Sequence, residues 1–219
     1  MGRMPGMRTD GVMDETAFPA GAYCHAVSRI IAAGQRMDRF GWVPATAGNI
    51  SIRLPDGTLA ITRSGGHKGL LGPDGVIRVD ATGAPCTDGD RPSAETLLHC
   101  QIYAHDATAG AVLHGHSVAS TVLSMAGGNA LVLEGYEVQK VFAGQDTHAA
   151  RVHVPIFDND QDIARLSGVV APHLADMHAG YIIRGHGVYV WGADMDVALA
   201  RLEGLEFLLA CELERRKLG

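Results

Sequence analysis

Apolar residues recur at two different spacings along the chain, and these spacings predict where helices and strands lie. Residues 20–42 and 195–217 carry apolar side chains at helical spacing. Asp194 precedes the second run, where an aspartate favours a helix N-terminus. Shorter apolar or alternating runs are typical of strands, and they occupy residues 46–66, 75–83, 110–116, 130–135, 151–157 and 180–192. The chain is therefore expected to be an α/β protein.

Shorter helices are expected between the strands, because cap and turn residues divide the remaining sequence. Ser93 is the predicted N-cap of a helix that runs to about residue 105. Residues 117–127 predict a short helix, and residues 160–177 predict a helix that Pro172 interrupts. The Asp-Gly pair at residues 56–57 is typical of a hairpin turn. Helices and strands mix without a regular βαβ order, which favours a layered α/β domain with a substantially antiparallel sheet.

Length and composition narrow the classes of protein that fit. A length of 219 residues is typical of one domain, so we expect a single catalytic domain over residues 20–219. Residues 1–19 are expected to form a flexible N-terminal extension. The net charge of −6 and the scattered basic residues disfavour nucleic acid as a partner. Apolar runs are too short for a membrane span, and the N-terminal stretch lacks the apolar core of a secretory signal. The four cysteines show no paired spacing, which favours free thiols in a cytoplasmic protein. Because no membrane span is expected, we also expect no membrane partner.

The stretch HGHS, at the end of an apolar strand-like run, holds the strongest chemical signal. Residues i and i+2 of a strand point to the same face, so His114 and His116 project together. Two neutral imidazoles that converge in this way make half of a site for zinc or another divalent metal. Such a pair is also common as two ordinary polar residues, so a third ligand is needed. His186 is the candidate, because glycines flank it at the end of a buried strand.

Five separated motifs resemble one known family. Over about residues 20–217 the chain is similar to the class II aldolase/epimerase family of zinc enzymes, in the motifs TAGNIS, ITRSGGHKG, RPSAETLLH, VLHGHS and RGHGVYVWG. The segments LEGYEVQKVFAG and VPIFDNDQDI are most similar to the branch that dehydrates methylthioribulose 1-phosphate in methionine salvage. The resemblance implies that His114, His116 and His186 hold one zinc ion per subunit. It also implies a three-layer α/β/α fold with a mostly antiparallel sheet, and a homotetramer with sites near subunit boundaries.

Two glycine-containing turns are candidates for binding a substrate phosphate. Gly48-Asn49 and Ser64-Gly65 expose backbone N–H groups beside an amide and a hydroxyl, which together suit a phosphate dianion. In the resembled family these turns bind the sugar phosphate, and Lys68 is a candidate for an added positive charge. Ordinary turn chemistry is the alternative for the glycines, and a solvated surface lysine is the alternative for Lys68.

Two glutamates compete for the acid–base role. Glu95 falls in the first turn of the helix expected from Ser93, where glutamate often only complements the helix dipole. The family resemblance places the glutamate of a similar PSAE motif beside the zinc of sugar-phosphate aldolases. Glu137 lies in GYEVQK, and the resemblance to the dehydratase branch implies a general acid/base there; the alternative is a solvated carboxylate paired with Lys140. We favour Glu137 for proton transfer and keep Glu95 as the second carboxylate.

The resemblance therefore predicts a zinc-dependent lyase that acts on a small sugar phosphate. Its expected reaction removes water from 5-methylthioribulose 1-phosphate and yields 2,3-diketo-5-methylthiopentyl 1-phosphate. One alternative is an aldolase or epimerase of the same family that acts on fuculose or ribulose phosphates. The other is a non-enzymatic assembly module of the adducin type, which the three histidines disfavour because adducin head domains lack them. The remaining histidines are expected to have ordinary structural roles.

Overall fold

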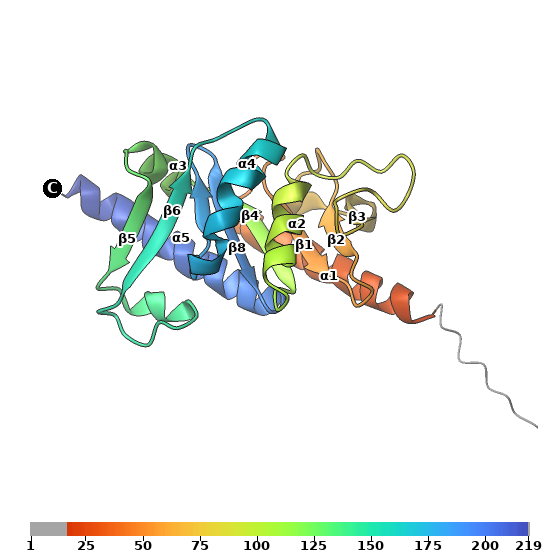
Figure 1. Cartoon of the computed structure of the whole chain (residues 1–219), viewed down its shortest axis with the longest axis horizontal. Coiled ribbons are helices and arrows are strands. Elements are labelled where there is room, and N and C mark those ends of the chain that lie inside the picture. The colour runs from red at the N-terminus through yellow and green to blue at the C-terminus, as the bar shows by residue number, and fades with distance from the viewer. Residues whose placement is uncertain (1–16, 219) are drawn as a thin grey trace, which may run out of the picture.

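The protein is built around one eight-stranded sheet with helices on both faces (Figure 1). A computed structural model describes residues 17–218. The α-helices are α1 (Ala17–Arg39), α2 (Thr96–His105), α3 (Val118–Met125), α4 (Ile163–Val170) and α5 (Met195–Lys217). The strands are β1 (Asn49–Arg53), β2 (Leu59–Thr62), β3 (Val76–Val79), β4 (Ala111–Gly115), β5 (Ala130–Glu134), β6 (Arg151–Phe157), β7 (Tyr181–Ile183) and β8 (Gly187–Gly192). Short 3₁₀ helices are η1 (Lys68–Leu70), η2 (Pro73–Gly75), η3 (Glu137–Val141) and η4 (Ala171–Asp176).

The sheet confirms the expected antiparallel character. Its strand order is β3-β2-β1-β4-β8-β7-β6-β5, and β6 and β7 form the one parallel pair among these neighbours. A parallel pair needs a crossover connection, and here α4 and η4 supply it. The last strands of the chain therefore lie in the middle of the sheet, where β8 separates β4 from β7.

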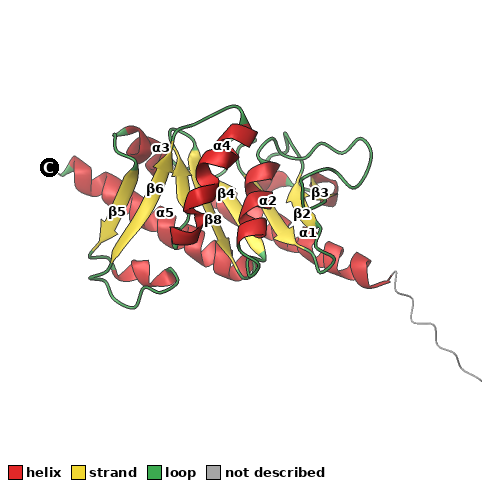
Figure 2. Cartoon of the chain, viewed as in Figure 1, coloured by secondary structure: helices red, strands yellow, loops and turns green. Residues whose placement is uncertain are grey.

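The helices form two layers, which confirms the three-layer expectation. Buried residues of α1, α3 and α5 pack with one face of the sheet, and those of α2 and α4 pack with the other. In the view of Figure 2, α2 and α4 lie in front of the strands and α5 lies behind them. Alternate residues of β8 point to opposite faces of the sheet. Val188 and Val190 pack on the side of α1, α3 and α5, whereas Tyr189 and Trp191 pack on the side of α2 and α4.

Local signals in the sequence are mostly confirmed. Asp194 caps α5 by accepting a hydrogen bond of 2.8 Å from the backbone N–H of Val197. The residue after Asp56 adopts a positive φ of 82° in the β1–β2 hairpin, as the Asp-Gly signal predicts. Pro172 lies where α4 changes to the 3₁₀ helix η4, so the expected interruption is present.

One predicted helix start is wrong. Helix α2 begins at Thr96, and Ser93 does not cap it. The hydroxyl of Ser93 instead accepts a hydrogen bond of 3.0 Å from the amide of Asn49, which lies on β1. Its backbone carbonyl accepts from Thr96, so residues 93–95 form a turn before the helix. A long-range contact has therefore replaced the local cap.

The predicted extension over residues 1–19 lies mostly outside the described residues. The described chain begins at residue 17, with the first residue of α1. No helix among residues 17–218 combines the length and the apolar character that crossing a membrane requires.

Gly187→Ala is expected to destabilise the protein, because it would force β8 away from β4. A Cβ atom at Gly187 would lie 2.2 Å from the carbonyl oxygen of Gly115 and 3.1 Å from the ring of His114. Overpacking of this kind costs about 1–3 kcal/mol of unfolding free energy. Urea unfolding of the two proteins measures the loss.

Gly168→Ala is the matched control. Gly168 lies in α4 with no atom within 4 Å of an added Cβ, so alanine should leave stability unchanged or raise it by up to about 1 kcal/mol. A Gly187→Ala protein as stable as the wild type would contradict the close pairing of β4 and β8.

Candidate functional site

Strand pairing brings residues from distant parts of the sequence to one edge of the sheet. Asn49 begins β1 and lies opposite His114, near the end of β4. His114 in turn lies opposite Tyr189 of β8. His186 occupies the turn between β7 and β8, where its backbone N–H donates to the carbonyl of Ile183. The fold therefore places the histidines of HGHS and RGHG side by side.

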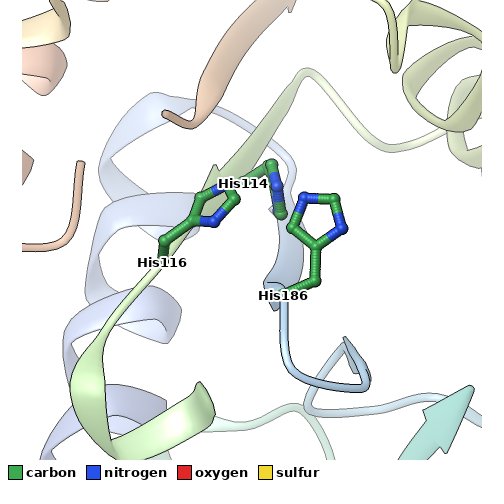
Figure 3. Close-up of side chains that lie close together, drawn as sticks. All are labelled: His114, His116 and His186. Atoms are coloured by element: carbon green, nitrogen blue, oxygen red, sulfur yellow. The ribbon is translucent and has the colours of Figure 1, made fainter. Parts of the chain in front are cut away.

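The three predicted histidines form one cluster, as Figure 3 shows. Ligand atoms of His114, His116 and His186 all lie within 4.8 Å of one another. The ring centroid of His114 is 4.4 Å from that of His116 and 5.1 Å from that of His186, and the last two are 4.7 Å apart. Three side chains with nitrogen donors thus converge on one point, as a metal site requires.

The protonation of His114 leaves a lone pair facing the cluster. Its Nδ1 lies 2.9 Å from the carbonyl oxygen of Val188. Because a carbonyl can only accept, Nδ1 carries the proton and Nε2 presents its lone pair. This Nε2 is buried and has no hydrogen-bond partner in the described chain. A buried nitrogen without a partner is costly, and a metal ion would satisfy it.

The first two histidines are neutral at neutral pH. Burial lowers the pKa of His114 to about 4, and burial likewise lowers the pKa of His116 to about 3, helped by the neighbouring imidazoles. A histidine binds metal only in its neutral form, because the proton otherwise occupies the lone pair. The electrostatics of the site therefore fit a metal ligand set.

Glu95 lies against the histidine cluster. One carboxylate oxygen is 2.8 Å from Nε2 of His186, the other is 3.3 Å from Nε2 of His114, and the side chain is 13% exposed. Burial alone would raise the pKa of Glu95, but the histidines and the amide of Asn49, which donates at 2.6 Å, hold it well below its usual range. Glu95 is therefore an ionised carboxylate, and one of its oxygens faces the unprotonated Nε2 of His114 at 3.3 Å. A divalent cation between these two atoms would relieve their repulsion.

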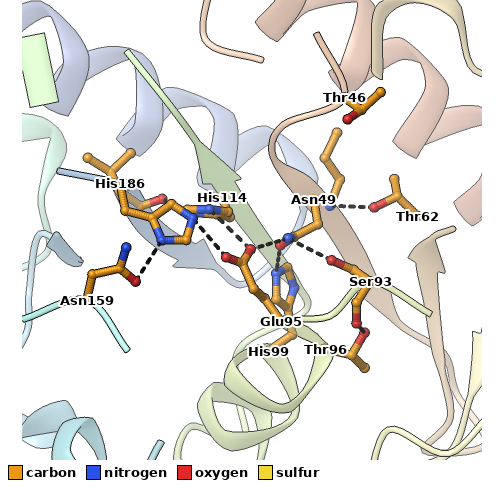
Figure 4. A network of polar contacts seen from close by, with 12 residues as sticks. Thr46, Asn49, Thr62, Ser93, Glu95, Thr96, His99, His114, Asn159 and His186 are labelled. Atoms are coloured by element: carbon orange, nitrogen blue, oxygen red, sulfur yellow. Dashed lines mark hydrogen bonds and ion pairs between the residues drawn. The ribbon is translucent and has the colours of Figure 1, made fainter. Parts of the chain in front are cut away.

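A chain of hydrogen bonds fixes Glu95 from behind, and Figure 4 shows its first members. The amide oxygen of Asn49 bonds Nε2 of His99, whose Nδ1 lies 2.7 Å from the hydroxyl of Ser51. That hydroxyl lies 2.9 Å from the hydroxyl of Tyr103. Because the amide oxygen accepts from His99, the amide nitrogen of Asn49 must point to Glu95.

Sequence reasoning missed three residues of this region. It gave His99 an ordinary structural role and Ser93 a capping role, and it did not consider Asn159, whose amide oxygen lies 3.4 Å from Nδ1 of His186. The spacing of Glu95 and His99 by four residues was a usable signal, since residues i and i+4 share one face of a helix.

The two predicted phosphate turns lie close together, and Lys68 joins them. Its amine donates to the carbonyl of Thr46 at 2.6 Å and to that of Gly66 at 2.7 Å. The alternative of a solvated lysine is wrong, because Lys68 is 2% exposed. Burial lowers the pKa of its amine to about 8, so the amine is still mostly charged at neutral pH.

The glycines of these turns have different surroundings. Gly48 has a positive φ of 78°, and a Cβ atom there would lie 2.8 Å from the carbonyl oxygen of His114. Only glycine fits this approach of the turn to β4. Gly65 also has a positive φ, of 81°, but no atom lies within 4 Å of an added Cβ, and the neighbouring Ser64 is exposed. The second turn therefore faces open space.

Glu137 is not brought to the histidines within the described chain. It begins the 3₁₀ helix η3, and its side chain is 71% exposed. Lys140 donates to it at 2.6 Å, and this hydrogen bond lowers the pKa of Glu137. The ion pair predicted as the structural alternative is therefore present.

Comparisons with known proteins agree over nearly the whole chain. The family model described as "Class II Aldolase and Adducin N-terminal domain" matches residues 28–213. A methylthioribulose-1-phosphate dehydratase of Gluconacetobacter diazotrophicus is 75% identical over 195 residues, covering 89% of this chain and 95% of the relative. A protein of the same name from Pseudomonas aeruginosa is 54% identical over 189 residues, covering 85% of this chain and 92% of the relative.

Solved structures show the same fold. The L-fuculose-1-phosphate aldolase from Thermus thermophilus superposes with a TM-score of 0.74 at 24% identity, covering 90% of this chain and 97% of the aldolase. Fold, motifs and sequence identity thus agree, and the chain belongs to the class II aldolase and adducin family.

Proposed function

We propose that this chain is a zinc-dependent dehydratase that removes water from 5-methylthioribulose 1-phosphate in methionine salvage. The observation that carries the proposal is the cluster of His114, His116 and His186, present in a chain that is 75% identical to a dehydratase of that name. Three protein ligands leave further coordination positions for substrate oxygens, as catalytic zinc requires. The free cysteines among the described residues support a reducing compartment, so we place the enzyme in the cytoplasm.

The residues around the cluster account for the chemistry. Zinc, when bound, supplies Lewis acidity that makes the C3 proton of a C2 ketone easier to remove. An ionised carboxylate takes the proton from C3, and the hydroxyl of C4 then leaves as water after receiving a proton. The resulting enol becomes the 2,3-diketone by moving its hydroxyl proton to C4. Buried, water-poor surroundings strengthen each of these electrostatic interactions.

The contacts favour Glu95 for the proton transfer. Its carboxylate is ionised, fixed by Asn49, and within hydrogen-bond distance of His186. The role expected for Glu137 stays a prediction from the family resemblance. Because Glu137 is exposed and is not in the histidine cluster of its own chain, we propose that it reaches the cluster of a second subunit. That arrangement agrees with the homotetramer that we propose.

Lys68 and the two turns form the phosphate site of this proposal. Two of the three N–H groups of Lys68 bond carbonyls of the turns, which leaves one for a phosphate oxygen. The exposed hydroxyl of Ser64 and the backbone of Gly65 line the open side. A charged amine, a hydroxyl and backbone N–H groups are the donors that a phosphate dianion prefers.

His186→Ala should remove the bound metal. The variant keeps two of the three imidazoles, too few for a stable zinc site, so zinc per subunit should fall from one to near zero and turnover should disappear. Elemental analysis after dialysis measures the metal. His178→Ala is the control, because His178 is exposed and outside the cluster. Full zinc and full rate in His186→Ala would overturn the ligand assignment.

Lys68→Met should raise KM with little change in kcat. Loss of a charged hydrogen bond to phosphate costs about 1.5–3 kcal/mol, or a rise in KM of about tenfold to a hundredfold. The pKa of about 8 gives a second readout: the amine loses its charge as the pH rises through 8, so the wild-type KM should rise there and the KM of Lys68→Met should not. Lys217→Met, at an exposed lysine of α5, is the control. An unchanged KM in Lys68→Met would place the phosphate elsewhere.

Glu95→Gln should lower kcat by about 10²–10⁴-fold, the usual contribution of general acid–base catalysis, while substrate still binds. Glutamine keeps the shape of the side chain but cannot accept the C3 proton. Stopped assays of diketone formation measure kcat, and zinc content is measured in the same samples. A near-normal Glu95→Gln beside an inactive Glu137→Gln would assign the proton transfer to Glu137.

A mixing experiment tests whether Glu137 acts across a subunit boundary. If one site uses Glu95 of one subunit and Glu137 of its neighbour, hybrids of Glu95→Gln and Glu137→Gln subunits contain some sites with both glutamates. Activity should then reappear when the two inactive proteins are unfolded together and refolded. No recovery from two variants that are each inactive would place both glutamates in the same subunit's site.

A further inference from the structure

The strand order arranges the chemical groups of the site along a line. Strands β2, β4, β7 and β6 all end at the same edge of the sheet, because each is parallel to the others through the pairings of the sheet. The phosphate turns adjoin the start of β1 and the end of β2, and the histidine cluster lies at the end of β4 and in the β7–β8 turn. The end of β6 comes next along the same edge of the sheet. With neighbouring strands about 4.8 Å apart, this edge spans about 20 Å from β1 to β6.

A cavity of about 550 Å³ lies at the β6 end of this line. Its lining includes Phe157, at the end of β6, and Leu166 and Val169, on α4. Asn159 also lines it, and the amide oxygen of Asn159 lies 3.4 Å from Nδ1 of His186. The cavity therefore adjoins the histidine cluster on the side away from the phosphate turns.

The charges of the cavity disfavour a phosphate group. Asp158 and Asp160 line it beside Arg165, and the guanidinium of Arg165 pairs with Asp160 at 2.5 Å. Asp158 pairs at 2.6 Å with Arg184, which also bonds backbone carbonyls. Each guanidinium is thus already neutralised, in contrast with the Lys68 amine near the other end of the line, which has no carboxylate partner in the described chain. An uncharged group fits the cavity better than a dianion.

With the phosphate at the turns before β1 and after β2, as proposed above, we infer that the methylthio group of the substrate lies in the cavity between β6 and α4. The inference rests on the proposed function, which supplies a linear substrate with phosphate on C1, the reacting oxygens in the middle and a thioether on C5. That order of groups matches the order of turns, histidines and cavity along the sheet. Apolar side chains and the ring of Phe157 suit a thioether sulfur and its methyl group.

Val169 is the residue that should decide how long a tail the enzyme accepts. It lines the cavity and is 52% exposed, so its side chain contributes little to the core. Phe157 and Leu166 are buried in the core cluster, and their replacement would disturb the fold. A change of size at Val169 therefore alters the cavity with the least effect on stability.

The test compares two substrates in the wild type and in Val169→Trp. The second substrate is 5-deoxyribulose 1-phosphate, which keeps the phosphate, ketone and hydroxyls and lacks the methylthio group. The wild type should prefer the methylthio substrate by about 10–100-fold in kcat/KM, the discrimination expected of a small apolar pocket. Val169→Trp should lower kcat/KM for the methylthio substrate about tenfold or more and leave the deoxy substrate within about twofold.

Two further variants keep the result interpretable. Val132→Trp is the matched control, because Val132 is 42% exposed on β5 and lines a different cavity; it should leave both substrates unchanged. Val169→Ala enlarges the cavity without added bulk, so the ratio of kcat/KM for a 5-ethylthio substrate to that for the methylthio substrate should rise.

Several outcomes would overturn the inference. One is that Val169→Trp lowers kcat/KM equally for the methylthio and deoxy substrates, while Val169→Ala leaves the ratio of kcat/KM for the ethylthio and methylthio substrates unchanged. A wild type that handles the deoxy and methylthio substrates equally well would mean that no pocket binds the tail. A wild type that dehydrates neither substrate would contradict the proposed function, and the tail assignment would fall with it.

Discussion

Lone pairs that face one another at the edge of the sheet are the constraint on which the site depends. Nε2 of His114 carries no proton and lies 3.3 Å from the carboxylate of Glu95, whose other oxygen lies 2.8 Å from Nε2 of His186. Such an arrangement is repulsive unless a cation lies between the groups. Backbone pairing of β1, β4 and β8 and the hydrogen-bond chain behind Asn49 hold the groups in place against that repulsion. The fold therefore assembles the groups of a candidate metal site through its own strand pairing and hydrogen bonds.

The sequence predicted which three histidines cluster, because their signal is local. Two histidines separated by one residue on a strand, and a third between glycines, need little more than strand geometry to be read together. The antiparallel sheet and the long terminal helix were also predictable, since alternation and helical spacing are properties of short segments. The order in which the strands pair was not derivable from those local patterns, because it depends on contacts between residues far apart in the chain.

The errors and omissions share one cause. Serine often caps helices, yet the hydroxyl of Ser93 accepts a hydrogen bond from Asn49 on β1. His99 looks like an ordinary buried histidine in sequence, yet it orients the amide that holds Glu95. In each case tertiary contacts decide the role of a polar side chain whose local pattern is uninformative.

The position of β8 in the sheet sets when this site can form during synthesis. Because β8 inserts between β4 and β7, the centre of the sheet stays incomplete until residue 192 of 219 has been made. His186, in the turn that precedes β8, emerges from the ribosome at the same late stage, about seventy residues after its partners. A nascent chain therefore offers only a weak two-imidazole site for most of its translation. A site with all three imidazoles therefore requires the long-range pairing of β4 with β8, which only a nearly completed chain can form.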